Sequence, residues 1–228
     1  GDCDDQDAST IGDSCVAGSS PEALVRLDGR QAALRPIAGT RPRGADPEED
    51  AALELELLGD PKENAEHVML VDLARNDLGR VAVPGTIEVN PYRSIERYSH
   101  VMHMVSGTTG VLAPDRDALD LFTAAFPAGT VVGAPKIRAM QLISELEPGP
   151  RGLYAGTVGY FGAGGSMDQA IAIRTIEFRD GRYAFQAGAG IVYDSVPESE
   201  LAECAAKAGA LVEAVAMAED AARGASDD

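Results

Sequence analysis

The 228-residue sequence contains no tryptophan, few lysines and no long run of uncharged apolar residues. A transmembrane helix needs about 18 or more such residues in succession, so the sequence predicts no membrane-spanning segment. The first residues, Gly1 to Asp5, offer neither the basic region nor the apolar run of a signal peptide. We therefore expect a chain that is neither inserted in a membrane nor exported through this end.

Basic residues are also scarce, because 37 Asp and Glu face only 19 Lys and Arg, which gives a net charge of −18. Such a charge argues against nucleic acid as a partner, since phosphate binding needs a basic surface. It argues equally against an anionic membrane surface. With only three lysines, the acid excess is typical of a salt-adapted, halophilic protein, in which screening reduces self-repulsion. The alternative is a GC-rich genome, which would explain the arginines but explains the excess of acid less well.

Cysteine is rare as well, and Cys3, Cys15 and Cys204 lack the spacing of a metal site. An odd number of dispersed cysteines indicates reduced thiols and a cytoplasmic location. Hydrophobic residues nevertheless make up 45% of the chain, so a packed core is expected rather than disorder.

The hydrophobic pattern predicts short strands that alternate with helices. Asp28-Gly29 is a hairpin signal between two apolar runs. Strands are expected at 23–27, 31–37, 81–89, 100–112, 154–161, 167–178 and 182–187, and helices at 48–58, 60–78, 117–126, 135–146 and 195–218. Because hairpins dominate, we predict an α+β fold of largely antiparallel β-sheets flanked by helices. Residues 1–17 are expected to be an acidic, poorly ordered start, 18–218 one catalytic domain, and 219–228 a polar tail.

Two predicted helices each carry two glutamates three residues apart, Glu63 with Glu66 and Glu200 with Glu203. Residues at this spacing share a helix face, so four carboxylates on facing helices could hold Mg²⁺ together with water and a ligand oxygen. The alternative is that these pairs are solvated, and that Glu63 completes a capping box with Asp60.

Three glycine-containing segments are candidate ligand loops. The segment 129–136 resembles a P-loop only loosely, because Lys136 is followed by Ile137 rather than Ser or Thr. The run 162–165 lies between two predicted strands and reads as a turn. The segment 188–190, Gly-Ala-Gly, exposes backbone amides that an anionic ligand can approach closely.

Two polar residues in apolar surroundings leave alternatives open. His103 lies in a predicted strand, where a lone histidine is more often structural than catalytic. Arg174 follows an apolar run and is either a strand end that reaches solvent or a buried fork that faces a carboxylate.

Six segments in order carry a family resemblance: 36–44 (PIAGTRPRG), 66–77 (EHVMLVDLARND), 101–106 (VMHMVS), 126–130 (FPAGT), 133–136 (GAPK) and 186–192 (QAGAGIV). Together they resemble the C-terminal catalytic part of the anthranilate synthase component I family of chorismate-utilising enzymes. The resemblance covers about residues 18–218 and implies the chorismate-binding enzyme fold, truncated at its N-terminus.

This resemblance implies a lyase that converts chorismate and ammonia to anthranilate and pyruvate in tryptophan biosynthesis, with Mg²⁺ bound. It implies a glutamine amidotransferase subunit (component II) as the source of ammonia, and the missing N-terminal part as a possible separate chain. The implied metal ligands are Glu66 and Glu203, with Glu63 and Glu200 beside them. The implied catalytic residues are His103 and Thr130, and the implied substrate contacts are Gly39, Thr40, Tyr154, Arg174, Gly188, Ala189 and Gly190.

Related enzymes differ from this sequence at particular positions. Aminodeoxychorismate synthases typically carry a nucleophilic lysine where this chain has Ala38, and isochorismate and salicylate synthases generally lack the string at 72–77. Val132 stands where the family commonly has serine. The alternatives are another chorismate-utilising enzyme, a non-catalytic subunit or remnant of the same fold, and a dinuclear metal protein built on the four glutamates.

Overall fold

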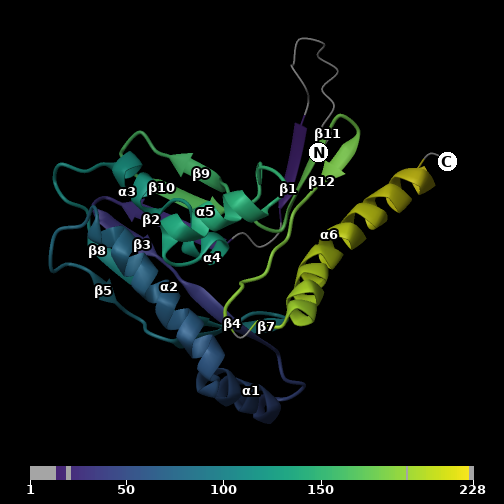
Figure 1. Cartoon of the computed structure of the whole chain (residues 1–228), viewed down its shortest axis with the longest axis horizontal. Coiled ribbons are helices and arrows are strands. Elements are labelled where there is room, and N and C mark those ends of the chain that lie inside the picture. The colour runs from purple at the N-terminus through teal and green to yellow at the C-terminus, as the bar shows by residue number, and fades with distance from the viewer. Residues whose placement is uncertain (1–13, 19–21, 194, 226–228) are drawn as a thin grey trace. The chain divides into compact units, whose positions relative to one another are not determined.

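A computed structural model of the chain describes residues 14–18, 22–193 and 195–225 (Figure 1). Its contacts divide the chain into two compact units. The first unit comprises residues 1–22, 148–157 and 171–228, and the second comprises residues 23–147 and 158–170.

A six-stranded sheet, essentially within the second unit, has the order β5-β8-β3-β2-β10-β9. Its strands are β2 (Glu22–Asp28), β3 (Gln31–Leu34), β5 (Glu88–Val89), β8 (Thr108–Val111), β9 (Thr157–Phe161) and β10 (Met167–Ile171). The β2–β3 hairpin is confirmed, because Asp28 pairs with Gln31 across a two-residue loop in which Gly29 has a φ of 58°. Alternate side chains of these strands, among them Val25, Leu27 and Met167, form the core.

A second sheet in the same unit has the order β4-β7-β6 and is antiparallel. It consists of β4 (Ile37–Pro42), β6 (Ser94–Arg97) and β7 (Val101–Val105). The helices α1 (Pro47–Gly59) and α2 (Pro61–Gly79) pack against β4. Leu57 of α1 and Met102 and Met104 of β7 are fully buried together, so His103, between the two methionines, points to the other face of the strand.

The remaining helices of this unit are α3 (Ala118–Ala125), α4 (Gly129–Val132) and α5 (Lys136–Leu146). The predicted helices at 48–58, 60–78, 117–126 and 135–146 are thus confirmed. Asp60 caps α2 as expected, since its carboxylate accepts from the N–H groups of Lys62 and Glu63. The Glu63 carboxylate, however, lies at Arg41.

The prediction of one strand over 100–112 was wrong, because the chain breaks at Ser106-Gly107 between β7 and β8, which belong to different sheets. The Ser106 hydroxyl is buried against His67, and the Gly107 N–H donates to Pro91 O. A Cβ at Gly107 would lie 2.5 Å from Asn90 O, so only glycine fits where the chain crosses. The run 167–178 breaks in the same way, between β10 and β11 (Thr175–Arg179), which also belong to different sheets.

The first unit contains the antiparallel sheet β1-β11-β12 and one long helix. Its elements are β1 (Ser14–Gly18), β11 (Thr175–Arg179), β12 (Arg182–Ala184) and α6 (Pro197–Ala225). The helix α6 begins at Pro197 rather than at Ser195, whose hydroxyl accepts from Val192 N, and it continues to Ala225 rather than ending near 218. Strand β1 begins at Ser14, and residues 1–13 and 226–228 of the expected start and tail lie outside the described residues.

The predicted class is confirmed, because helices flank sheets whose described registers are all antiparallel. Cys15 is disulfide-bonded, so the expectation of reduced thiols was wrong at this position, whereas Cys204 is a free thiol. Within the described ranges no single helix is long and apolar enough to cross a membrane, although α3–α4 and α5, bent by 58°, pass that test together by length and composition.

His67 of α2 is a fully buried polar residue that joins this helix to the sheets. Its Nε2 lies 2.7 Å from Ser106 Oγ, which also accepts from Arg93 N at 2.9 Å. Burial, with a smaller contribution from the positive charge of Arg93, lowers the pKa of His67 from 6.5 to about 4. The ring is therefore neutral in the folded protein at neutral pH.

This burial predicts how stability depends on pH. The unfolded chain takes up a proton at His67 below about pH 6.5, whereas the folded chain does so only near pH 4. The free energy of unfolding therefore falls by about 3 kcal/mol as the pH is lowered from 6.5 to 4. Urea denaturation between pH 4 and 7.5 should show this slope, and H67Q should reduce it. H100Q, at an exposed histidine, is the control, and an unchanged slope in H67Q would contradict the assignment.

Candidate active site

The centre of the site in the second unit is His103, which faces the strand β4. Its Nδ1 lies 3.0 Å from Thr40 Oγ1 and 3.3 Å from Gly39 O. A carbonyl oxygen only accepts hydrogen bonds, so this contact favours a proton on Nδ1 and leaves the lone pair on Nε2. The Tyr98 ring lies beside the imidazole, with 5.7 Å between the ring centroids. The arrangement gives His103 a fixed ring that can accept a proton at Nε2.

The strand β4 bulges at Gly39, and this bulge brings the backbone to His103. The antiparallel register shifts between Ala38 and Thr40, and Gly39 has a φ of 75°, which favours glycine. A Cβ at Gly39 would lie 2.8 Å from Leu57 Cδ1 and 3.3 Å from Glu63 Oε2. Close packing on α1 and α2 therefore adds a second requirement for glycine.

Arg41, two residues further on, is surrounded by carboxylates. Its Nε donates to Glu56 at 2.8 Å, its Nη2 to Asp60 at 2.8 Å, and its Nη1 to Glu63 at 3.3 Å. Nη1 also donates to the Thr40 carbonyl at 3.0 Å. The carboxylate of Glu63 is thus engaged by an arginine, which makes it a poor candidate for a metal ligand.

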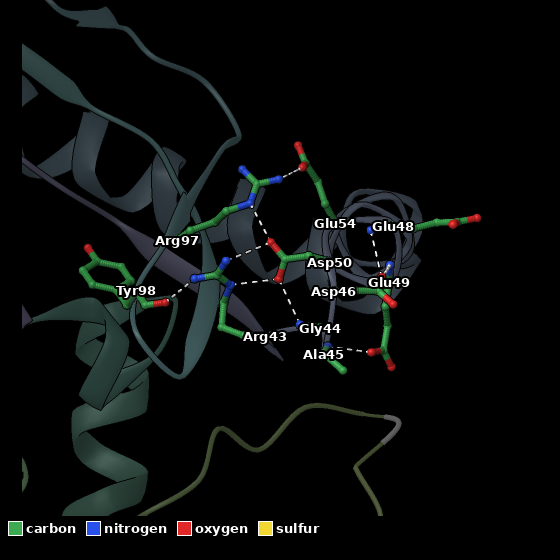
Figure 2. A network of polar contacts seen from close by, with 10 residues as sticks. All are labelled: Arg43, Gly44, Ala45, Asp46, Glu48, Glu49, Asp50, Glu54, Arg97 and Tyr98. Atoms are coloured by element: carbon green, nitrogen blue, oxygen red, sulfur yellow. Dashed lines mark hydrogen bonds and ion pairs between the residues drawn. The ribbon is translucent and has the colours of Figure 1, made fainter.

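A second acidic cluster holds the segment that follows β4 (Figure 2). Asp50, only 7% exposed, accepts from Arg43 at 2.8 and 3.1 Å, from Arg97 at 3.1 Å and from Gly44 N at 2.9 Å. Arg43 also donates to the Tyr98 carbonyl at 2.7 Å. The hydrogen bonds from Arg43 and Gly44 hold the pKa of Asp50 well below its usual value. The cluster therefore fixes both the segment after β4 and the backbone of Tyr98 beside His103.

Thr130 lies on the short helix α4, which packs on α2. Its hydroxyl is buried and has no hydrogen-bond partner in the described part of the chain. A Cβ at Gly129 would lie 2.0 Å from Leu73 Cδ2, so the glycine lets α4 approach α2 closely. A buried hydroxyl without a hydrogen-bond partner destabilises the fold, so a ligand that hydrogen-bonds to it would bind more tightly. The neighbouring Val132 adds no polar atom.

Lys136 has a structural role, in agreement with the rejection of a P-loop. Its Nζ lies 2.8 and 2.9 Å from the two Asp77 oxygens and 3.1 Å from Ala125 O. Both partners of this ion pair are nearly buried. Burial raises the pKa of Asp77, and the ammonium of Lys136 acts against that rise.

In the first unit, two of the expected site residues, Gly188 and Glu203, contact Lys207 of α6, and Tyr154 lies beside Gly188. Its Nζ donates to Gly188 O at 3.1 Å and pairs with Glu203 at 2.7 Å. A Cβ at Gly188 would lie 2.9 Å from the Tyr154 hydroxyl, whose ring faces the Arg151 guanidinium at 5.4 Å. The residues that follow, Ala189 and Gly190, lie in the same segment without regular secondary structure.

Arg174 and Glu22 form a further charged group in this unit. Arg174 is exposed just before β11 and has a φ of 50°, which agrees with the strand-end interpretation of the sequence. Burial raises the pKa of Glu22 from 4.5 to about 7, against the opposing positive charges of Arg174 and Lys207. The sequence analysis missed Glu22, whose only local signal is a carboxylate at the start of an apolar strand. Such a perturbed carboxylate is a candidate functional group.

The possible metal ligands are distributed over both units. Glu66 is half-buried one turn after Glu63 on α2, whereas Glu200, 6% exposed, and Glu203 lie on α6. Among the described residues, no group of three or more His, Cys, Asp or Glu side chains forms a ready metal site. Oxygen-only donors nevertheless suit Mg²⁺, which is commonly held by one or two carboxylates plus water and ligand oxygens.

These features define the class of protein. The antiparallel α+β fold is shared with solved chorismate-utilising enzymes. The family model described as "chorismate binding enzyme" matches residues 8–213, and the chain belongs to this family.

Several known proteins are similar to this chain. Anthranilate synthase component 1 of Aquifex aeolicus is 60% identical over 205 residues, which are 90% of this chain and 42% of that protein. The protein of the same name from Streptomyces coelicolor is 58% identical over 207 residues, 91% of this chain and 40% of that protein. The chain thus spans less than half the length of these relatives.

Solved structures agree with this resemblance. Anthranilate synthase component I from Streptococcus pneumoniae superimposes with a TM-score of 0.80 at 48% identity, over 87% of this chain and 43% of that chain. A putative 2,3-dihydroxybenzoate-specific isochorismate synthase from Bacillus anthracis gives a TM-score of 0.78 at 32% identity, over 91% of this chain and 56% of that chain. The family resemblance of the six sequence motifs is therefore confirmed.

The bulge at Gly39 predicts the effect of a methyl group there. G39A should destabilise the protein by about 2–4 kcal/mol, since it combines a positive φ with a collision against Leu57. G29A is the matched control, because its φ of 58° is similar but a Cβ there meets nothing within 4 Å. It should cost only about 1–2 kcal/mol. Urea denaturation of both variants measures the difference, and equal losses would show that packing at Gly39 is unimportant.

Proposed function

We propose that this chain is the catalytic part of an anthranilate synthase, which converts chorismate and ammonia to anthranilate and pyruvate for tryptophan biosynthesis. The observation that carries the proposal is its 60% identity over 205 residues to a curated anthranilate synthase component 1. Identity to the isochorismate synthase structure is only 32%. As in a component 1, ammonia would come from a glutamine amidotransferase subunit. Salt adaptation, which the net charge of −18 supports, and a cytoplasmic location also belong to the proposal.

Chorismate is a dicarboxylate, which a chain of this net charge repels at long range. Binding therefore needs local positive groups. We assign this role to Arg174 and to the backbone amides of Gly188, Ala189 and Gly190, with Tyr154 beside them. In the second unit Gly39 and Thr40 are the proposed substrate contacts. The small residues leave room for close approach, and the arginine fork suits a carboxylate.

We assign the metal to Glu66 and Glu203, with Glu200 next to Glu203. Bound Mg²⁺ would supply positive charge to a substrate carboxylate. Glu63 pairs with the partly buried Arg41 and is left out of the proposed ligand set, whereas Glu203 pairs with Lys207 at the surface, where an ion pair is weak and can be displaced. A dinuclear site that needs all four glutamates therefore loses support. The role of Lys207 is to hold the Glu203 carboxylate and the Gly188 carbonyl in place.

His103 is the proposed proton-transfer group, acting through Nε2, since Nδ1 is oriented by Gly39 and Thr40. The unpartnered hydroxyl of Thr130 is the proposed donor to the substrate. Ala38 is buried beside this site and offers only a methyl group, so the chain cannot hold the substrate covalently at that position. Ammonia is then the nucleophile that attacks the ring.

The product decides between the related activities. The chain should be incubated with chorismate, Mg²⁺ and an ammonium salt, alone and together with the amidotransferase and the remaining part of a component 1. We expect anthranilate fluorescence and an equal amount of pyruvate. Mass spectrometry that finds 4-amino-4-deoxychorismate or a protein adduct would instead indicate the aminodeoxychorismate activity, and no turnover would favour a non-catalytic subunit.

The metal assignment predicts a selective loss. E66Q and E203Q should each raise the Mg²⁺ concentration for half-maximal activity about 10-fold or more, because a neutral amide binds Mg²⁺ less well than a carboxylate. E213Q, on the exposed side of α6, is the matched control and should leave it unchanged. Activity that persists unchanged in EDTA, or equal effects in all three variants, would refute the assignment.

A further inference from the structure

We propose that Arg41 is a positioning residue, which sets the tautomer and orientation of His103 by anchoring the Gly39-Thr40 backbone to the helices α1 and α2. The side chain of Arg41 is only 17% exposed, and all three of its nitrogens take part in hydrogen bonds. An arginine saturated in this way is not available to bind a ligand, so its role lies in what it holds.

The contacts of Arg41 join the strand β4 to the junction between the helices α1 and α2. Glu56 lies in the last turn of α1, Asp60 is the N-cap of α2, and Glu63 lies in the first turn of α2. The same guanidinium donates to the carbonyl of Thr40 within β4. The arginine therefore fixes the path of the strand immediately after the bulge relative to the start of α2.

The path of β4 determines which groups the His103 ring contacts. Its Nδ1 faces both the Gly39 carbonyl and the Thr40 hydroxyl, so a small displacement of these two residues removes the acceptor that favours Nδ1–H. Glu63 adds a second link, because its carboxylate packs on the Gly39 backbone while it is held by Arg41. Arg41 thus influences the orientation of His103 through both Gly39 and Thr40.

Charge makes this arrangement depend on the arginine. Glu56, Asp60 and Glu63 converge on a single guanidinium, and without it three carboxylates would face one another in a partly buried place. Like charges at such distances repel, so the start of α2 would move away from β4. Lysine keeps the positive charge but not the planar fork that serves several partners at once.

Nuclear magnetic resonance offers a test that needs no turnover. The chain has only three histidines, so ring ¹⁵N signals at a pH above 8 can be assigned with H103Q and H100Q. We expect the Nδ1–H tautomer of His103 in the wild type and a substantial fraction of Nε2–H in R41Q, with R41K in between. R26Q, which loses only an exposed pair with Asp28, should leave the signals unchanged.

Kinetics provide the second readout, which rests on the proposed function. R41Q should lower kcat for anthranilate formation about 10- to 100-fold and change KM for chorismate much less, as expected for a misplaced catalytic group. R41K should recover part of kcat. If the wild type shows no turnover, the proposed function fails while the ¹⁵N signals still decide the role of Arg41.

Circular dichroism and the thermal midpoint establish that each variant is folded. If R41Q does not fold, E63Q removes one contact alone and should shift the His103 tautomer in the same direction, by a smaller amount. A folded R41Q, or in its place a folded E63Q, whose His103 signals match the wild type would overturn the proposal. A kcat that falls in R41Q by no more than in R26Q would overturn it as well.

Discussion

The second unit depends on ion pairs between two arginines, Arg41 of β4 and Arg43 just after it, and carboxylates at the helices α1 and α2. Arg41 gathers carboxylates from α1 and α2, and Arg43 binds Asp50 at the start of α1. These ion pairs are multiple and partly buried, which distinguishes them from single exposed pairs that contribute little. They hold both helices against β4, and β4 in turn carries the bulge that meets His103.

A net charge of −18 makes such local compensation necessary. Asp77 pairs with Lys136, and Asp50 pairs with Arg43 and Arg97. Removing one partner would leave an uncompensated buried charge, which is far more costly than losing a surface pair. For Glu22, as for Asp77, burial raises the pKa more than the nearby cations lower it.

In both units, glycine allows the backbone to approach other groups closely. At Gly39 it allows the strand to bulge against α1 and α2, and at Gly188 it brings a backbone segment to the Tyr154 hydroxyl. Both segments belong to the motifs that carry the family resemblance. The same property, the lack of a Cβ, thus permits close packing at both places.

Structural elements that depend on a few neighbouring residues could be predicted from the amino-acid sequence. Asp60 and Pro61 predicted the start of α2, Asp28-Gly29 predicted the hairpin, and six ordered motifs predicted the family. Caps, turns and motifs depend on a few neighbouring residues, so they can be read without the fold.

Which partner each polar group takes became clear from the packed fold. The expected strand breaks at Ser106-Gly107, the Glu63 carboxylate lies at Arg41 rather than in a capping box, and His67 is buried. Each of these outcomes depends on groups that are tens of residues away along the chain. Local sequence does not specify such distant contacts, because burial and charge pairing are settled only when the sheets and helices pack together.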